Sequence, residues 1–206
     1  MGALPAALRF ATRLRTIAVP LVRSELSVCH VGDVFRTSWL DALPLSAARL
    51  PAVTLIAGSN FERVAPGDAA DALGGRTRSY ENLHIHVDWA ALASRILERA
   101  LGRRVACAAY MSRAGDTSLG PHDDEWDGVI VQVGGEKRWR VWTGRDNGPE
   151  EIVTRVGDVL FLRQGITHDV STPDCSLHLA FAVRDRPLVV EPPHAGLDEE
   201  GPRTGM

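Results

Sequence analysis

The sequence has few cysteines, no long apolar run and no strong excess of charge. Its three cysteines, Cys29, Cys107 and Cys175, are far apart and form no paired motif. This pattern supports neither a disulfide framework nor a zinc knuckle, and it predicts a reducing compartment. No segment approaches the roughly 18 apolar residues that a membrane-spanning helix needs. The net charge of -3 argues against nucleic acid or an anionic membrane surface as a partner.

What is present is the composition of an ordinary globular protein. Hydrophobic residues make up 45% of the chain and charged residues 24%, and 206 residues can bury one sizeable core. Arg9, Arg13 and Arg15 interrupt what would be the apolar core of a signal peptide, so a cytoplasmic location is predicted. The arginine-rich, acid-free start of the chain fits a basic amphipathic helix lying on its own domain. A transit peptide or a surface-docking helix would show the same pattern.

Helical periodicity is confined to the first half of the chain. Apolar residues recur at helical spacing in residues 3–17, and a second short helix is predicted over residues 34–43. Asp88 is a plausible N-cap for a helix that runs to Leu101 and is closed by Gly102. The first two helices predict an N-terminal helical cover.

Strand-like alternation dominates the remainder and predicts a mainly β fold. Many short strands at near-regular spacing are typical of a sandwich or barrel. We therefore expect a helical cover in residues 1–50, a catalytic domain in 51–183 and a mobile tail in 184–206, which is rich in Pro, Gly and Glu. The predicted strands cover residues 53–56, 83–87, 105–112, 128–133, 136–142, 151–154, 159–162 and 177–183.

Two segments supply candidate metal ligands. His122 and Asp124 are two residues apart, a spacing that on a strand places both side chains on the same face. His168 follows an apolar strand and a glycine turn and supplies a third ligand. Two histidines and one carboxylate leave three coordination positions open, as in non-haem Fe(II) oxygenases. The His-x-Asp pair alone is a weak signal, because such pairs arise by chance on polar strand edges.

The strand predicted at residues 136–142 places a lysine in the interior. The glycine pair at residues 134–135 predicts a two-residue hairpin turn before it, and period two puts Lys137 on the face of Trp139. A buried lysine needs an anion, to which Tyr110 could donate its hydroxyl. Alternatively, Lys137 reaches solvent at the strand edge and Tyr110 is simple core. The opposite, solvated face carries Glu136, Arg138 and Arg140.

The runs at residues 110–142 and 157–168 resemble the JmjC-type 2-oxoglutarate oxygenases. Ribosomal oxygenases look nearest, and the asparaginyl hydroxylase that inhibits hypoxia-inducible factor is a more distant cousin. The family pattern is His-x-Asp, then Gln ten residues after the His, then Gly-x-Lys/Arg-x-Trp. It is matched by His122, Asp124, Gln132, Gly135, Lys137 and Trp139. The resemblance covers residues 80–183 and implies a double-stranded β-helix (jelly roll, cupin).

The resemblance also implies a chemistry for these residues. Fe(II) would be held by His122, Asp124 and His168, and the distal carboxylate of 2-oxoglutarate by Lys137 and Tyr110. With O2, such enzymes couple oxidative decarboxylation of 2-oxoglutarate to hydroxylation of a carbon on a second substrate. A halogenase needs the carboxylate position vacant for chloride, so Asp124 favours hydroxylation.

The chain also departs from the family pattern. Ala108 stands where relatives often carry asparagine near the co-substrate, and Asp123 stands where they often carry tyrosine. Ribosomal oxygenases continue into a helical dimerisation region and a winged-helix-like domain, whereas this sequence ends soon after the last predicted strand. The dimer and the ribosomal substrate are therefore not carried over, and the oligomeric state stays open.

Five further residues each have two possible roles. Trp126, Gln132 and His178 could contact substrate, although an aromatic beside a barrel mouth is more often simple packing. His84 and His86 resemble a ligand pair in isolation. We interpret these two histidines as the solvated face of the strand predicted at residues 83–87.

The substrate expected from the resemblance is a peptide or protein side chain. The main alternative is the same chemistry on a small biosynthetic metabolite. A non-oxidative metal-binding cupin, either an isomerase or a binding module, is a different class of hypothesis. Such a cupin has no need of an inward lysine placed to meet a dicarboxylate, so Lys137 discriminates against it. A degenerate fold kept for protein contacts would not need the intact set of three ligands.

Overall fold

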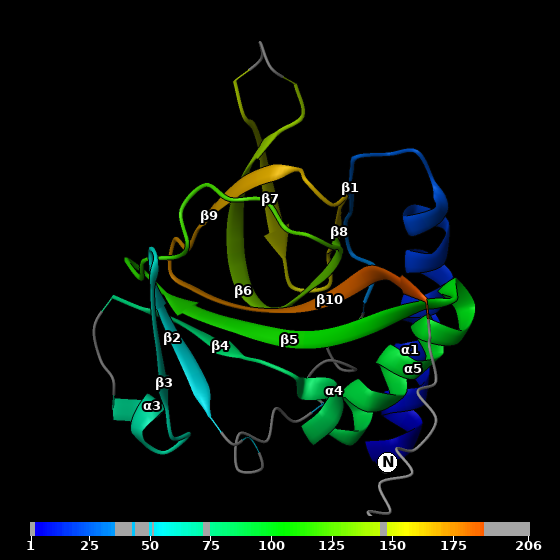
Figure 1. The fold of residues 1–206 in the computed structure, drawn as a ribbon, viewed down its shortest axis with the longest axis horizontal. Helices are drawn as coiled ribbons and strands as arrows, with labels where there is room; N and C mark the ends of the chain where they lie inside the picture. Colours follow the sequence, from blue (N-terminus) through cyan, green and yellow to red (C-terminus); the bar gives the residue numbers. More distant parts are fainter. Residues whose placement is uncertain are drawn as a thin grey trace, which may run out of the picture.

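Antiparallel strands are the predominant secondary structure of the described residues, and the longer helices gather at one side (Figure 1). The computed structural model describes residues 3–35, 43, 50, 52–71, 75–144 and 148–187. Its helices are α1 (Ala3–Arg23), α3 (Asp68–Asp71), α4 (Leu83–His86) and α5 (Asp88–Leu101). Its strands are β1 (Val28–Val31), β2 (Val53–Ala57), β3 (Asn60–Val64), β4 (Thr77–Tyr80), β5 (Arg103–Arg113), β6 (Asp127–Trp142), β7 (Glu150–Arg155), β8 (Val159–Leu162), β9 (Thr167–Ser171) and β10 (Cys175–Pro187).

Strand β6 belongs to two groups of strands. Its first half lies between β8 and β10 in a sheet ordered β1-β8-β6-β10-β5-β4-β2-β3. Its second half pairs with β7 on one side and β9 on the other. Figure 1 shows β7 and β9 lying over β5 and β10, so the strands enclose an interior. The predicted mainly β, jelly-roll class is confirmed.

Strand β8 of the larger sheet is buried on both faces, which explains why its sequence is apolar throughout. Val159 and Phe161 pack into the core beneath the helices, whereas Leu160 and Leu162 pack into the core between the sheets. Successive side chains on a strand point to opposite faces, so a strand covered on both sides needs an unbroken apolar run.

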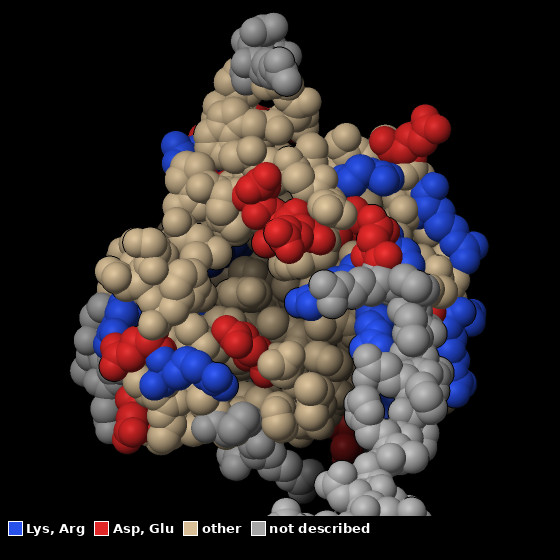
Figure 2. All heavy atoms as spheres, in the orientation of Figure 1, with Lys and Arg blue, Asp and Glu red and all other residues tan. Residues whose placement is uncertain are grey.

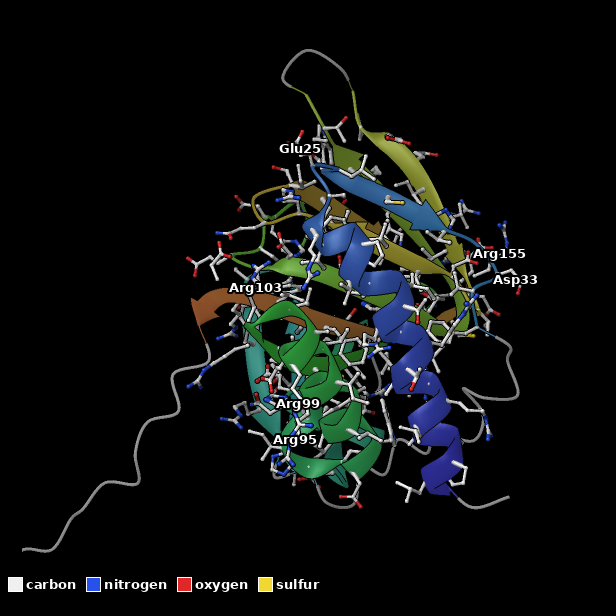
Figure 3. The ribbon with its side chains drawn as sticks, turned by 90° about the vertical axis from the view of Figure 1, so that its right-hand side faces the viewer. Glu25, Asp33, Arg95, Arg99, Arg103 and Arg155 are labelled. Carbon is white, nitrogen blue, oxygen red and sulfur yellow. The ribbon has the colours of Figure 1, made fainter. Side chains whose placement is uncertain are left out.

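Helices α1 and α5 lie side by side against one face of the larger sheet (Figure 3). Phe10 of α1 is fully buried and meets the edge of the Trp89 ring on α5, with ring centroids 5.9 Å apart. The helix predicted over residues 3–17 is confirmed and continues to Arg23. Most of the helix predicted at 34–43 falls outside the described residues. Within the described part of the chain, no helix is long and apolar enough to cross a membrane.

The C-terminal end of α5 agrees with the prediction, whereas the N-terminal end does not. Gly102 closes the helix as predicted, with φ of 70° and its N–H donating to the Glu98 carbonyl. The N-cap is Val87 rather than Asp88, and it makes no side-chain capping hydrogen bond. Asp88 lies in the first turn, where its carboxylate interacts favourably with the positive end of the helix dipole.

The strand predicted at residues 83–87 is wrong, because this segment forms the single turn α4. The Val87 N–H donates to the Leu83 carbonyl at 2.8 Å. Leu83 and Val87 are buried whereas Ile85, between them, is 68% exposed. Residues four apart share a face of a helix, so the apolar pattern also fits one helical turn.

The hairpin turn predicted at residues 134–135 is also wrong. Strand β6 continues through both glycines and shifts its register against β10 at this point. Gly135 has φ of 61°, and a Cβ built there would lie 2.0 Å from the Cys175 carbonyl oxygen. Hairpin turns and β-bulges both need such a conformation, so the sequence could not tell a reversal from a bend.

We predict that Gly135→Ala strongly destabilises the protein. The left-handed conformation alone costs an alanine about 1–2 kcal/mol, and overpacking against the Cys175 backbone adds about 1–3 kcal/mol. Gly58→Ala is the matched control, because Gly58 has φ of 58° but open space around its Cβ position. Urea unfolding of both variants measures the difference. Equal losses of unfolding free energy would contradict the close approach at Gly135.

Candidate metal centre

Two histidines lie side by side across an isolated β-bridge. The His122 N–H donates to the His168 carbonyl at 3.0 Å, and the His168 N–H donates to the His122 carbonyl at 2.8 Å. Their ring centroids are 4.3 Å apart. The bridge joins the segment before β6 to β9, so the backbone itself sets the spacing of the two rings.

Each ring is also held in one tautomer. His122 Nδ1 lies 2.8 Å from the Gly120 carbonyl, and His168 Nδ1 lies 3.0 Å from the Ile166 carbonyl. A carbonyl oxygen only accepts hydrogen bonds, so both Nδ1 atoms donate and carry the proton. Nε2 of each neutral ring is then left with a free lone pair, as metal-ligating histidines require.

Asp124 completes the group from the loop before β6. Its Oδ2 lies 3.8 Å from His168 Nε2. Ligand atoms of His122, Asp124 and His168 all lie within 4.8 Å of one another. The Asp124 carbonyl accepts a hydrogen bond from the Gly165 N–H at 3.0 Å, which ties this loop to the turn before β9. Backbone contacts of the loop, rather than a shared strand face, therefore bring the carboxylate to the histidines.

The electrostatics of this group favour a bound cation. Burial raises the pKa of Asp124 to about 6, although the nearby His122 opposes the shift. Burial likewise lowers the pKa of His168, with a partly opposing effect of its hydrogen bond to Ile166. The carboxylate is only partly solvated, and a divalent ion would supply positive charge beside it. The donor set and its spacing fit such an ion.

The three candidate ligands line a cavity of about 80 Å³. This is several times the roughly 10–15 Å³ that one water molecule needs. Figure 2 shows a hollow on this face of the protein, between β9 above and β5 and β10 below, with acidic side chains near its rim. The same cavity is also lined by Tyr110, Trp126, Lys137, Trp139 and His178.

Lys137 points into this interior, as predicted, and is only 1% exposed. The alternative of a lysine at the solvated strand edge is therefore wrong. Its Nζ donates to Ser112 Oγ at 2.9 Å and to Thr172 Oγ1 at 3.0 Å. Burial lowers the pKa of Lys137 to about 8. Within the described residues no carboxylate forms an ion pair with it, although Asp116 acts on its pKa from a greater distance.

The hydroxyl groups that contact Lys137 were not predicted from the sequence. Ser112 Oγ contacts Lys137 and also lies 3.0 Å from Thr77 Oγ1. Ser112 follows Tyr110 by two residues on β5, so period two could have placed both on one face. Thr172 lies after β9, far from Lys137 in the sequence, and carries no signal of its own.

The residues predicted to contact substrate divide into two groups. Trp126 and His178 line the cavity. Gln132 is fully buried elsewhere, where its Nε2 donates to the Gly134 carbonyl at 2.7 Å and to Ser176 Oγ at 2.9 Å. This amide holds the bend of β6 to β10 and does not line the cavity.

Tyr110, the second residue predicted to hold the co-substrate, lines the same cavity. Burial is the main cause that raises its pKa to about 12, and its hydroxyl shares a hydrogen bond with Ser79. The hydroxyl therefore stays protonated at neutral pH, as a hydrogen-bond donor must. The structure thus brings Tyr110 and Lys137 into one cavity with the three candidate ligands.

The pair His84 and His86 does not form a solvated strand face, because α4 is helical. The two side chains are two residues apart on a helical turn and so point in different directions. His84 Nδ1 accepts a hydrogen bond from the Cys107 N–H at 3.1 Å, and burial lowers its pKa. His84 thus attaches α4 to β5.

Comparison with known proteins agrees with this description. Residues 82–152 match the model of the JmjC domain family. Ribosomal oxygenase 2 of Rattus norvegicus is 30% identical over 97 residues, covering 40% of this chain and 21% of that protein. The bifunctional lysine-specific demethylase and histidyl-hydroxylase NO66 of Caenorhabditis briggsae is 29% identical over 98 residues, covering 37% and 13%. The chain thus matches about a fifth or less of the length of these relatives.

A solved structure shares the fold. The ribosomal oxygenase YcfD of Escherichia coli, in complex with cobalt and 2-oxoglutarate, superposes with a TM-score of 0.59 at 15% identity. The superposition covers 84% of this chain and 52% of that one. The sequence match, the shared fold and the resemblance first seen in the metal-ligand motif agree: this chain has a jelly-roll fold and is similar to the JmjC domain family over residues 82–152.

Proposed function

We propose that the protein is an Fe(II)- and 2-oxoglutarate-dependent dioxygenase that hydroxylates a carbon of a peptide or protein side chain. The observation that carries this proposal is the presence, in one cavity, of a two-histidine, one-carboxylate group and a buried lysine. A non-oxidative metal-binding cupin needs the first feature but not the second. The combination favours an oxygenase whose co-substrate is both a metal chelator and a dicarboxylate.

In this proposal His122, Asp124 and His168 hold the Fe(II) ion. The bound metal, with 2-oxoglutarate and O2, supplies the oxidative chemistry, and the protein supplies its orientation. The hydrogen bonds from Nδ1 of both histidines to backbone carbonyls leave each Nε2 with a free lone pair that would bind the ion. Apolar side chains around the cavity, among them Ile130 and Trp139, exclude bulk water.

Lys137 and Tyr110 hold the distal carboxylate of 2-oxoglutarate. An ammonium group paired with a carboxylate in a dry site gives a strong, charge-assisted hydrogen bond. The hydroxyls of Ser112 and Thr172 already orient the Lys137 ammonium group and offer further polar contacts. The similar fold of a protein solved with cobalt and 2-oxoglutarate supports this assignment.

The second substrate is a protein side chain by analogy with the relatives, whose names include ribosomal oxygenase and histidyl-hydroxylase. Trp126 lines the cavity and also a second, more polar hollow beside it, so it lies where a substrate chain would enter. A small biosynthetic metabolite is the alternative substrate.

Free cysteines support the cytoplasmic location that the sequence predicts.

We predict that loss of one candidate ligand abolishes metal binding. His168→Ala and Asp124→Ala should bind no Fe(II) when metal and protein are near stoichiometric, because two ligands hold the ion weakly. Anaerobic titration of the apoprotein with Fe(II) and then 2-oxoglutarate should show the visible charge-transfer band of a chelated keto acid in the wild type only. His86→Ala, outside the cavity, is the control.

Either outcome of this titration is informative. A band in the wild type that is lost in both ligand variants supports the oxygenase proposal. Fe(II) binding without the band would instead indicate a metal cupin of another kind. Full retention of Fe(II) by His168→Ala would remove His168 from the metal site.

We also predict that Lys137→Ala weakens 2-oxoglutarate binding by about tenfold or more and leaves Fe(II) affinity nearly unchanged. Removal of the cation leaves a desolvated carboxylate unpaired, which typically costs more than 1 kcal/mol. Anaerobic isothermal titration of the metal-free protein with Fe(II), and of the metal-loaded protein with 2-oxoglutarate, measures the two affinities. Arg138→Ala, on the exposed face of the same strand, is the matched control. Equal 2-oxoglutarate affinity in Lys137→Ala would exclude the lysine from the pocket.

The lysine should also give the metal-free protein a characteristic pH dependence. In the folded state the pKa of Lys137 falls from about 10.5 to about 8. Between these values the unfolded chain binds more protons than the folded protein, so the unfolding free energy contributed by Lys137 rises with pH. Relative to Lys137→Met, the wild type should gain stability from pH 8 to pH 10.5 in denaturant titrations. A constant difference would show that the lysine is solvated.

A further inference from the structure

His178 on β10 has a buried ring nitrogen without a partner. The residue is 6% exposed and lines the cavity, and its Nδ1 makes no hydrogen bond to any described residue. A buried polar atom that has lost water and gained no partner destabilises the folded protein. The unpaired atom belongs to a ring that lines the cavity, so a ligand bound there is the available partner for it.

The ring of His178 is held by its neighbours on two sides. It stacks on Tyr110 with centroids 5.2 Å apart and an angle of 18° between the planes. It meets the Trp139 ring at 5.5 Å and 63°. Backbone pairing places His178 opposite Tyr110 on β5 and Gln132 on β6. The orientation of the ring is therefore set before any ligand arrives.

Two other residues of the cavity act electrostatically on His178. Burial is the main cause that lowers its pKa well below the ordinary value, and Lys137 and His168 lower it further. The ring is therefore neutral and carries a single N–H. Lys137 belongs to the proposed carboxylate site and His168 to the proposed metal site. Lys137, His168 and His178 all line one cavity, so His178 shares its wall with both proposed sites.

Building on the proposed function, we propose that His178 binds the co-substrate directly, donating a hydrogen bond from its Nδ1–H to an oxygen of 2-oxoglutarate. Ionised 2-oxoglutarate offers only oxygen acceptors, so the neutral ring must carry its proton on Nδ1. The co-substrate is then held at three places: by the metal, by Lys137 together with Tyr110, and by His178. A donor on a rigid ring fixes the position of the keto acid in the cavity.

Two substitutions separate the donor from the ring. His178→Phe keeps an aromatic ring to stack on Tyr110 and removes the donor. His178→Asn removes the ring, but its amide N–H₂ can take the place of Nδ1–H. Because His178→Phe also removes an unpaired buried atom, the metal-free variant should melt no lower than the wild type. Thermal unfolding therefore checks that any loss of binding is not a loss of folding.

The test is the anaerobic titration with Fe(II) and 2-oxoglutarate. We expect His178→Phe to bind Fe(II) like the wild type and 2-oxoglutarate about tenfold or more weakly, as for a lost hydrogen bond to a charged group. His178→Asn should recover most of this affinity. Equal 2-oxoglutarate affinity in His178→Phe and the wild type would overturn the inference. Equal losses in both variants would overturn it too, because the ring and not the donor would then matter.

The same titration separates failure of this inference from failure of the proposed function. If the wild type binds Fe(II) but gives no charge-transfer band with 2-oxoglutarate, the oxygenase proposal itself fails, whatever the variants do. If the wild type gives the band and His178→Phe matches its affinity, the oxygenase proposal stands and only the role of His178 is lost.

Discussion

The bend of β6 at Gly135 is the constraint on which the rest of the structure depends. Before the bend, β6 lies between β8 and β10, and after it β6 lies between β7 and β9. Only a residue without Cβ can pass this close to the Cys175 carbonyl in a left-handed conformation. The bend therefore lets a single strand belong to both groups of strands around the cavity. Lys137 follows two residues after the bend and points into that cavity.

Buried polar groups around the bend are connected to one another. The Gln132 amide donates to the Gly134 carbonyl and to Ser176, and Thr154 Oγ1 donates to Gln132 Oε1 at 3.1 Å. Trp139 Nε1 donates to the same Thr154 hydroxyl. Each of these polar atoms has a partner, so the network can be buried without a large penalty. It fixes the bend of β6 and, through the Trp139 hydrogen bond, holds one side chain that lines the cavity.

The cavity itself contrasts with that satisfied network. Asp124 and Lys137 have opposite charges when ionised. Burial raises the pKa of Asp124 and lowers that of Lys137, and both shifts favour the neutral form of the side chain. No ion pair between them is found in the described residues, and His178 Nδ1 also lacks a partner. Such unsatisfied groups destabilise a folded protein and are usually kept where a ligand pairs with them. A cation at the three ligands and a dicarboxylate at the lysine would pair with these groups.

Local patterns in the sequence were reliable where one physical cause produced them. Period two correctly placed Lys137 and Trp139 inside and Arg138 outside, because adjacent residues of a strand face opposite sides. They were unreliable where two structures share one pattern. Leu83 and Val87 fit both a strand and a helical turn, and the glycines at 134–135 fit both a hairpin and a bulge.

The sequence by itself determined the mainly β class, the inward lysine and the identity of the three candidate ligands, because strand period and motif spacing are local properties. Only the tertiary structure decided which residues meet in the cavity. The bridge between His122 and His168, the Thr172 hydroxyl on Lys137 and the stacking of His178 on Tyr110 all join distant segments. No local pattern reports such contacts, since they depend on how the whole chain packs.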